Sequence, residues 1–302
     1  MKLSGTMEDA IFGVGVGKIA GVLTNSENYC HENRLLWSVY RAKVISETSV
    51  IDVNQDPFQV IPVVKVVGMD VKFNEVLESL VPEENLVQIV GLYGTGGVGK
   101  TTLLQKVNNE FAKRKMFDVV IWIVVSNCLN FRSIQNKIGK KVGLQWSEGT
   151  ETYERANDIF KGLKNRRFLL LLDDIWEGID LETIGVSRNS IQFTGSKVVF
   201  STRSEQVGGL MEADKRIKIE CLEDDQDWSL FQQKVKQEAL SCHPEVLEVA
   251  KKVSKECRGL PLALITIGRP MSSKTDLKQW QHALCTLQDA ASQFSCTNCQ
   301  VF

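Results

Sequence analysis

Residues 94–101 read Gly-Thr-Gly-Gly-Val-Gly-Lys-Thr, which fits the spacing of a loop that binds phosphate groups. The glycines of such a loop allow backbone angles that other residues rarely adopt, so that successive amide groups can surround an anion. Lys100 supplies a mobile positive charge for the β- and γ-phosphates. Thr101 supplies a hydroxyl group for Mg²⁺. The loop therefore predicts binding of a nucleoside triphosphate.

The segments on either side of the loop support this prediction over the alternative, a glycine-rich turn with a solvated lysine. Leu86–Leu92 is a nearly continuous apolar run, typical of a strand buried on both faces of a parallel sheet. A helix is predicted from about Lys100 to Arg114, and its N-terminus would add partial positive charge beside the phosphates. The nucleotide contacts predicted here are Gly94, Gly96, Gly97, Val98, Gly99, Lys100, Thr101 and Thr102.

Two carboxylates follow the apolar run Phe168–Leu172, which predicts a further buried strand. Ligands of open α/β sheets lie at the carboxyl ends of the strands. Asp173 is therefore predicted to hold Mg²⁺ through water, and Asp174 to orient or deprotonate an attacking water molecule. The alternative is a plain turn with helix-capping acids, which the preceding phosphate loop makes the weaker interpretation.

Lys197–Ser201 predicts another strand, and polar residues follow it as they follow the two strands described above. Arg203 lies just after it and is predicted to reach the γ-phosphate, where a cation also stabilises a phosphoryl group in transfer. The alternative is a surface arginine, because most arginines are exposed.

Strands alternate with helices up to about residue 222, which predicts an α/β fold with a parallel sheet flanked by helices. From Asp224 helices alone are predicted, as in a small helical domain. The predicted domains are an N-terminal remnant and linker (1–60), a nucleotide-binding domain (61–222), a helical domain (223–291) and a tail (292–302). The other predicted elements are helices at Gly68–Leu80, Phe131–Leu163 (one or two), Gln226–Lys236, Glu245–Cys257, Leu260–Gly268 and Leu277–Asp289, and strands at Val119–Val125 and Arg216–Ile219.

The first 60 residues carry weaker signals. Asn28–Glu47 has the spacing of a helix, without a sustained heptad pattern. Gly13–Lys18 mimics a phosphate loop but lacks its spacing and a preceding strand, so we do not predict a site there.

Composition narrows the class of protein. The 302 residues carry a net charge of −1, which argues against a strongly basic surface for nucleic acid. The basic run at 113–115 is interpreted as the solvated end of a helix. Ile11–Leu23 is too short to cross a bilayer, and Cys296 and Cys299 lack the second ligand pair of a zinc site. We expect a cytoplasmic protein without a transmembrane segment, which reaches a membrane only through partners.

Taken together, these segments resemble the NB-ARC domain of plant nucleotide-binding, leucine-rich-repeat disease-resistance proteins, nearest the coiled-coil class. The resemblance covers about residues 60–290. Gly259-Leu-Pro-Leu-Ala263 is its most diagnostic part, because it is similar to a turn of the family's first helical ARC subdomain. The other matching segments are Gly94–Thr101 (Walker A), Phe117–Ser126, Leu169–Trp176 (Walker B), Val198–Arg203 (the sensor strand), and Trp280 with Leu284.

The resemblance implies a molecular switch that ADP holds inactive, that ATP activates and oligomerises, and that slow hydrolysis resets. It places Val67 and Gly68 near the adenine and lets Pro261 close the helical domain over the nucleotide. It also implies partners: the chain itself, other immune receptors or a guarded host protein.

Parts of the family pattern are missing. We find no winged-helix subdomain with its Met-His-Asp motif and no leucine-rich repeats, so the chain resembles a truncated receptor. One alternative function is therefore a degenerate interaction module or decoy that does not switch. Another is a P-loop ATPase of a different class with rapid turnover, which is disfavoured because no basic field for DNA and no substrate-binding insertion is evident.

Overall fold

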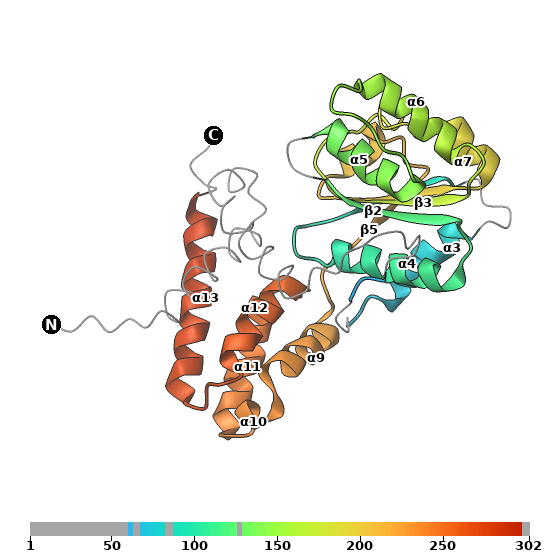
Figure 1. Cartoon of the computed structure of the whole chain (residues 1–302). Coiled ribbons are helices and arrows are strands. Elements are labelled where there is room, and N and C mark those ends of the chain that lie inside the picture. Colours follow the sequence, from blue (N-terminus) through green and yellow to red (C-terminus); the bar gives the residue numbers. More distant parts are fainter. Residues whose placement is uncertain (1–59, 63–66, 82–86, 126–128, 298–302) are drawn as a thin grey trace. The chain divides into compact units, whose positions relative to one another are not determined.

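The computed structural model describes residues 60–62, 67–81, 87–125 and 129–297, with the side chains described as far as residue 289 (Figure 1). These residues belong to two compact units. One is an α/β unit within Val53–Gly94 and Gly99–Glu220. The other is a helical unit from Cys221 onward, with which the loop tip Thr95–Val98 is grouped. The glycine-rich segment Gly13–Lys18 and the predicted helix at Asn28–Glu47 lie outside the described residues.

A five-stranded sheet in the order β2-β3-β4-β1-β5 forms the centre of the α/β unit, and each pair of neighbours runs parallel. Because β3, β4 and β1 are successive parallel neighbours, the loops that follow these three strands meet at one edge of the sheet. The strands are β1 (Ile89–Tyr93), β2 (Val119–Val124), β3 (Phe168–Ile175), β4 (Lys197–Thr202) and β5 (Lys215–Lys218).

Helices cover both faces of this sheet. Helices α3 and α4 lie against one face, whereas α5, α6 and α7 lie against the other (Figure 1). A parallel sheet covered on both faces explains why its strands are apolar throughout rather than alternating. The helices of this unit are α3 (Asp70–Leu80), α4 (Lys100–Arg114), α5 (Phe131–Val142), α6 (Thr152–Leu163), α7 (Arg188–Thr194) and α8 (Glu205–Leu210).

The core follows from the two periodicities of strand and helix. Alternate residues of β2, such as Ile121 and Ile123, join a buried cluster with Ile138 of α5 and Ile159 of α6. On α4, Leu103, Leu104, Val107 and Phe111 recur at helical spacing, and all are fully buried. The two clusters fix the ends of the strands, and therefore the loops that follow them.

The helical unit consists of α9 (Asp224–Val235), α10 (Gln237–Leu240), α11 (Pro244–Glu256), α12 (Pro261–Met271) and α13 (Leu277–Thr297). Its core contains Phe231 and Trp280, whose rings meet edge to face with centroids 6.4 Å apart. The Trp280 Nε1 group donates to the carbonyl oxygen of Lys274 at 3.0 Å, so the indole is buried with its polar atom satisfied.

The structure corrects several of the predicted elements. Strand β3 continues through Asp173 and Asp174 to Ile175, whereas the sequence analysis ended it at Leu172. Helix α3 begins at Asp70 rather than Gly68, and β1 begins at Ile89 rather than Leu86. The short helices α7, α8 and α10 were not predicted, because segments of four to seven residues carry too few turns to show a helical period.

Candidate functional site

The predicted phosphate loop joins the end of β1 to the start of α4. Gly94, Gly97 and Gly99 have φ angles of 152°, 81° and 105°, a region that side chains other than glycine rarely adopt. At Gly99 a Cβ atom would also collide with the Cε of Met69. The glycines are therefore needed for the path of the backbone.

Lys100 is the first residue of α4, and its side chain curls back over the loop. Its Nζ donates to the Gly94 carbonyl oxygen at 2.6 Å, and the residue is only 7% exposed. Burial lowers the pKa of Lys100 to about 8; Arg203 adds to this effect, and the carboxylates of Asp174 and Asp173 oppose it. A buried ammonium group at a helix N-terminus creates a local excess of positive potential that an anionic ligand would relieve.

A network of hydroxyl groups joins α4, β3 and β4 around Asp173. The Oδ1 atom of this fully buried carboxylate accepts from Thr101 Oγ1 at 3.0 Å and from Ser201 Oγ at 2.6 Å. Thr101 itself is exposed. Hydroxyl and carboxylate oxygens are the hard donors that Mg²⁺ prefers, and Mg²⁺ takes few of them from protein when it also binds phosphate. The donor set of Thr101 and Asp173 therefore fits this metal.

Asp174 adopts an unusual backbone conformation. Its φ angle is 63°, in the left-handed region, and the register of β3 against β4 shifts between Leu172 and Ile175. The Asp174 amide donates to Ser201 Oγ at 2.9 Å, outside the regular ladder of the sheet. A non-glycine residue in this conformation is strained, and such strain clusters at functional sites. A bulge of this kind re-aims the side chain of the residue that it contains.

Arg203 follows β4 and lies next to the end of β3. Its Nε is 4.0 Å from Asp174 Oδ1, and its guanidinium carbon is 4.4 Å from the centre of the Trp176 ring. The flat guanidinium group suits both a carboxylate partner and an aromatic face. Arg203 is thus part of the same cluster as Lys100 and Asp174, in contrast to the alternative of an isolated surface arginine.

The remaining predicted residues lie in three places. Val67 and Gly68 directly precede Met69, whose side chain packs on the loop. Val98 is buried, Gly96 is half-buried within the loop, and Thr102 is half-buried in the first turn of α4. Pro261 is the first residue of α12 in the helical unit, where it is buried.

The sequence analysis missed Ser201 and Trp176 as members of this site. Ser201 is the hydroxyl group that connects Asp173 to Asp174, and Trp176 is the surface on which Arg203 rests. For both residues a signal was present in the sequence, because each lies two residues from a predicted site residue, Ser201 from Arg203 and Trp176 from Asp174.

The comparison with protein families decides the class. The NB-ARC domain model matches residues 69–241, more than half of the chain. This chain belongs to the NB-ARC domain family. The matched region contains the phosphate loop, both aspartates of β3 and Arg203, whereas Val67, Gly68 and Pro261 lie outside it.

Curated relatives of this NB-ARC chain are plant disease resistance proteins. It is 44% identical to disease resistance protein RPS5 of Arabidopsis thaliana over 257 residues, which cover 83% of this chain and 28% of that protein. It is 40% identical to disease resistance protein RFL1 of the same plant over 273 residues, covering 87% of this chain and 30% of that protein. The chain therefore spans less than a third of the length of these two relatives.

Solved structures give more distant matches. The ORC2 protein of Aeropyrum pernix is 15% identical with a TM-score of 0.49, covering 80% of this chain and 72% of that chain. A STAND-class signal transduction ATPase of Pyrococcus horikoshii is 22% identical with a TM-score of 0.44, covering 74% and 33%. Within the described residues, the NB-ARC chain has no helix with the length and apolar character needed to cross a membrane.

Proposed function

We propose that this NB-ARC chain binds ADP and ATP together with Mg²⁺ and serves as the nucleotide-dependent switch of a plant defence receptor. The observation that carries this proposal is the position of Lys100. Its ammonium group is buried at the N-terminus of α4. It lies beside the loop glycines that have positive φ angles and beside the hydrogen-bonded pair of Thr101 and Asp173. A polyphosphate with its metal ion satisfies all three features at once.

Each residue has a distinct task in this proposal. The loop amides and Lys100 bind the phosphates, and Thr101 and Asp173 hold Mg²⁺, the aspartate through water. When bound, the metal would neutralise phosphate charge. Ser201 orients the Asp173 carboxylate through the hydrogen bond of 2.6 Å, so that its lone pairs keep a fixed direction. Val67, Gly68 and Pro261 are proposed to contact the rest of the nucleotide.

Asp174 and Arg203 are proposed to respond to the γ-phosphate. Asp174 orients or deprotonates the attacking water, and Arg203 binds the γ-phosphate oxygens. In the structure these two side chains lie 4.0 Å apart and partly satisfy one another. A γ-phosphate would compete with Asp174 for the guanidinium group, so ATP but not ADP would loosen this pair. That difference between two ligands is what a switch requires.

The proposed function in a defence receptor is based on the similarity of this chain to disease resistance proteins. We propose that nucleotide exchange controls self-association or contact with other immune receptors or a guarded host protein, in the cytoplasm or at a membrane that partners reach. Since the chain covers less than a third of RPS5 and RFL1, the parts that sense a pathogen are not proposed to lie within it.

The direct test is to purify the chain under native conditions, denature it, and identify the released nucleotide by mass spectrometry. We expect a near-stoichiometric amount of ADP from the wild-type chain and little from Lys100→Ala. Folded wild-type protein that releases no nucleotide and takes none up would contradict the proposal. It would favour the alternative of a non-switching interaction module.

A further inference from the structure

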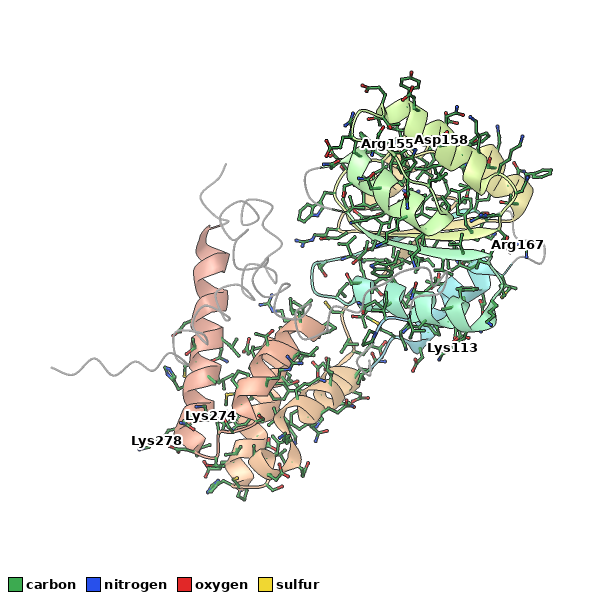
Figure 2. The ribbon with its side chains drawn as sticks, in the orientation of Figure 1. Lys113, Arg155, Asp158, Arg167, Lys274 and Lys278 are labelled. Atoms are coloured by element: carbon green, nitrogen blue, oxygen red, sulfur yellow. The ribbon has the colours of Figure 1, made fainter. Side chains whose placement is uncertain are left out.

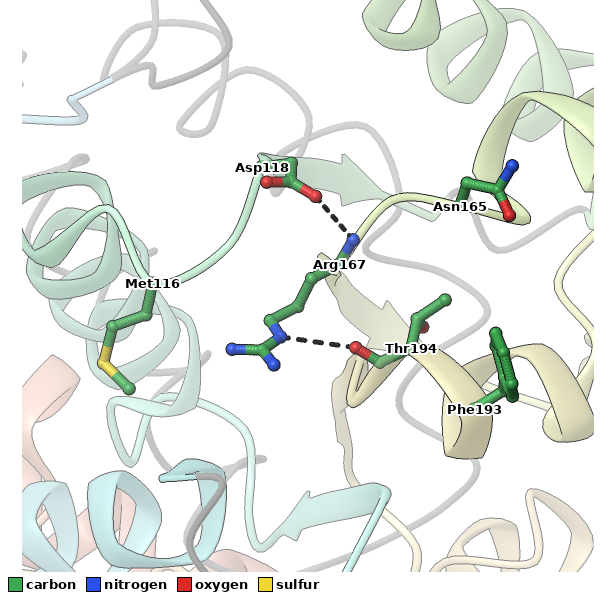
Figure 3. A pocket seen from close by; sticks show the side chains of 6 residues that line it. All are labelled: Met116, Asp118, Asn165, Arg167, Phe193 and Thr194. Carbon is green, nitrogen blue, oxygen red and sulfur yellow. Dashed lines mark hydrogen bonds between the residues drawn. The ribbon is translucent and has the colours of Figure 1, made fainter.

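A pocket of about 420 Å³ lies at the edge of the sheet opposite to the phosphate loop. Asp118 and Arg167 directly precede β2 and β3, whereas the phosphate loop follows β1. Because all paired strands are parallel, residues before the strands lie at the opposite edge from residues after them. The pocket is lined by Met116, Asp118, Asn165, Arg167, Phe193 and Thr194, and is therefore separate from the nucleotide site (Figure 3).

Arg167 is held in position within this pocket. Its Nε donates to the Thr194 carbonyl oxygen at 3.3 Å, and its backbone amide donates to Asp118 Oδ2 at 2.7 Å (Figure 3). Its two terminal nitrogens make no hydrogen bond or ion pair with any residue that the structure describes. A guanidinium group anchored by Nε keeps those two nitrogens available for parallel hydrogen bonds to a planar carboxylate.

Apolar side chains also line this pocket. Phe193, near the end of α7, is 87% exposed, the largest exposed fraction among the exposed large apolar residues that the structure describes. Met116 is half-buried across the pocket (Figure 3). Aromatic residues, Met and Arg are residue types enriched in protein–protein interfaces, so the lining is typical of a binding surface.

Basic side chains are frequent in the segments next to the pocket, although the whole chain has a net charge of −1 and Arg114 is paired with Glu110. The last turn of α4 and its C-cap supply Lys113, Arg114 and Lys115, which the sequence analysis interpreted as a solvated helix end. The turn before β3 adds Lys164 and Arg166. Figure 2 shows Lys113 and Arg167 toward the same end of the α/β unit. Tertiary structure thus joins basic segments that are about 50 residues apart in sequence, as the bond between Arg167 and Asp118 requires (49 residues).

We propose that this pocket docks an acidic segment of a partner protein. A carboxylate of the segment binds the terminal nitrogens of Arg167, and apolar side chains on either side of that carboxylate pack against Met116 and Phe193, which lie on opposite sides of Arg167 (Figure 3). The exposed carboxylate of Asp118 lies in the same pocket. The same carboxylate can accept a hydrogen bond from a peptide N–H group, so the mixed chemistry of the lining favours a peptide over phosphate-rich ligands.

The test uses the full chain and a fluorescein-labelled synthetic peptide in which Asp and Leu alternate, with binding followed by fluorescence polarisation. We expect the wild-type chain to bind this peptide, and a version with Asn in place of Asp to bind at least about tenfold more weakly. Arg167→Gln and Phe193→Ser are each expected to weaken binding by about tenfold or more.

Arg166→Gln is the matched control, because Arg166 is the neighbouring exposed arginine and does not line the pocket. It removes the same charge and should weaken binding by less than about threefold. Both arginine variants should retain the circular dichroism spectrum and the thermal midpoint of the wild type. Lys100→Ala should bind the peptide normally, so a failure of the nucleotide proposal is distinguishable from a failure of this one.

Three results would overturn the proposal. The first is no binding of the acidic peptide by the folded wild-type chain. The second is an equal loss in Arg166→Gln and Arg167→Gln, which would indicate diffuse electrostatic attraction rather than a pocket. The third is Arg167-dependent binding of phosphatidylserine vesicles or single-stranded DNA that exceeds binding of the peptide, which would assign the pocket to phosphate groups.

Discussion

The guanidinium group of Arg203 lies 4.4 Å from the centre of the Trp176 ring, at the ends of two neighbouring strands. This contact restricts a long side chain whose other partner, Asp174, is 4.0 Å away. An arginine that rests on an aromatic face loses less conformational entropy when it binds a ligand. Trp176 is therefore expected to act as a positioning residue for Arg203.

Removal of the aromatic face should affect the two nucleotides differently. In Trp176→Ala the affinity for ATP is expected to fall by about 3- to 30-fold, the range expected for loss of a cation–π contact, while the affinity for ADP changes by less than about twofold. Titration calorimetry with each nucleotide checks this. Trp176→Phe, which keeps an aromatic ring, should lose less ATP affinity than Trp176→Ala. Equal losses of ATP and ADP affinity would show that Trp176 supports the fold rather than Arg203.

Substitution at Asp174 should separate chemistry from binding. Asp174→Asn keeps the size of the side chain and tolerates the left-handed φ of 63°, so ADP affinity should stay within about twofold. The rate of ATP hydrolysis should fall by about 100-fold, because the general base is lost. A phosphate-release assay together with ADP titration measures both. If both properties are lost together, Asp174 has a role in metal binding or in the structure of the bulge instead.

A buried acid in the helical unit predicts a dependence of stability on pH. Asp227 of α9 is 5% exposed, and burial raises its pKa, with a further increase from Asp224 and an opposing hydrogen bond from Ser254. Since the folded state holds this proton more tightly than the unfolded state, the stabilising contribution is present at acid pH and is lost as pH rises through the raised pKa. At neutral pH the ionised carboxylate is therefore a cost to the fold.

Asp227→Asn should accordingly raise the thermal midpoint by a few degrees at neutral pH. The increase should be smaller at pH values below the ordinary pKa of an aspartate side chain. Thermal unfolding measured across this pH range tests the sign. The exposed neighbour Asp225 provides the control, because Asp225→Asn removes a favourable charge from the first turn of α9 and should not raise the midpoint at any pH. If Asp227→Asn were less stable than the wild type at neutral pH, the hydrogen bond between Asp227 and Ser254 would outweigh the cost of burying the ionised carboxylate.

Much of the fold could be predicted from local pattern. Helix α4 begins and ends where the sequence analysis placed it, because a glycine loop fixes its start and basic residues mark its last turn. The fold class follows from the alternation of apolar strands with amphipathic helices. The residues of the site were predicted because glycine, lysine and carboxylates at strand ends have few other uses in this spacing.

What could not be predicted depends on contacts between distant segments. The hydrogen bonds from Ser201 to Asp173 and from the Asp174 amide to Ser201 join β3 to β4, and no local pattern indicates them. The bulge at Asp174 was missed for the same reason. The pocket at the opposite edge of the sheet also arises from tertiary structure, since Met116, Arg167 and Phe193 come from three separate loops and helix ends.

The proposed function depends most directly on the binding of a polyphosphate by Lys100 and the surrounding loop. The most direct measurement is isothermal titration calorimetry of nucleotide-free chain with ADP and with ATP in the presence of Mg²⁺. We expect saturable binding of both nucleotides to the wild type, and a loss of at least about 100-fold in affinity for Lys100→Ala, because a buried charge-assisted contact is removed. Equal affinities of the wild type and Lys100→Ala, or no binding heat from folded wild-type protein at several temperatures, would contradict the central claim.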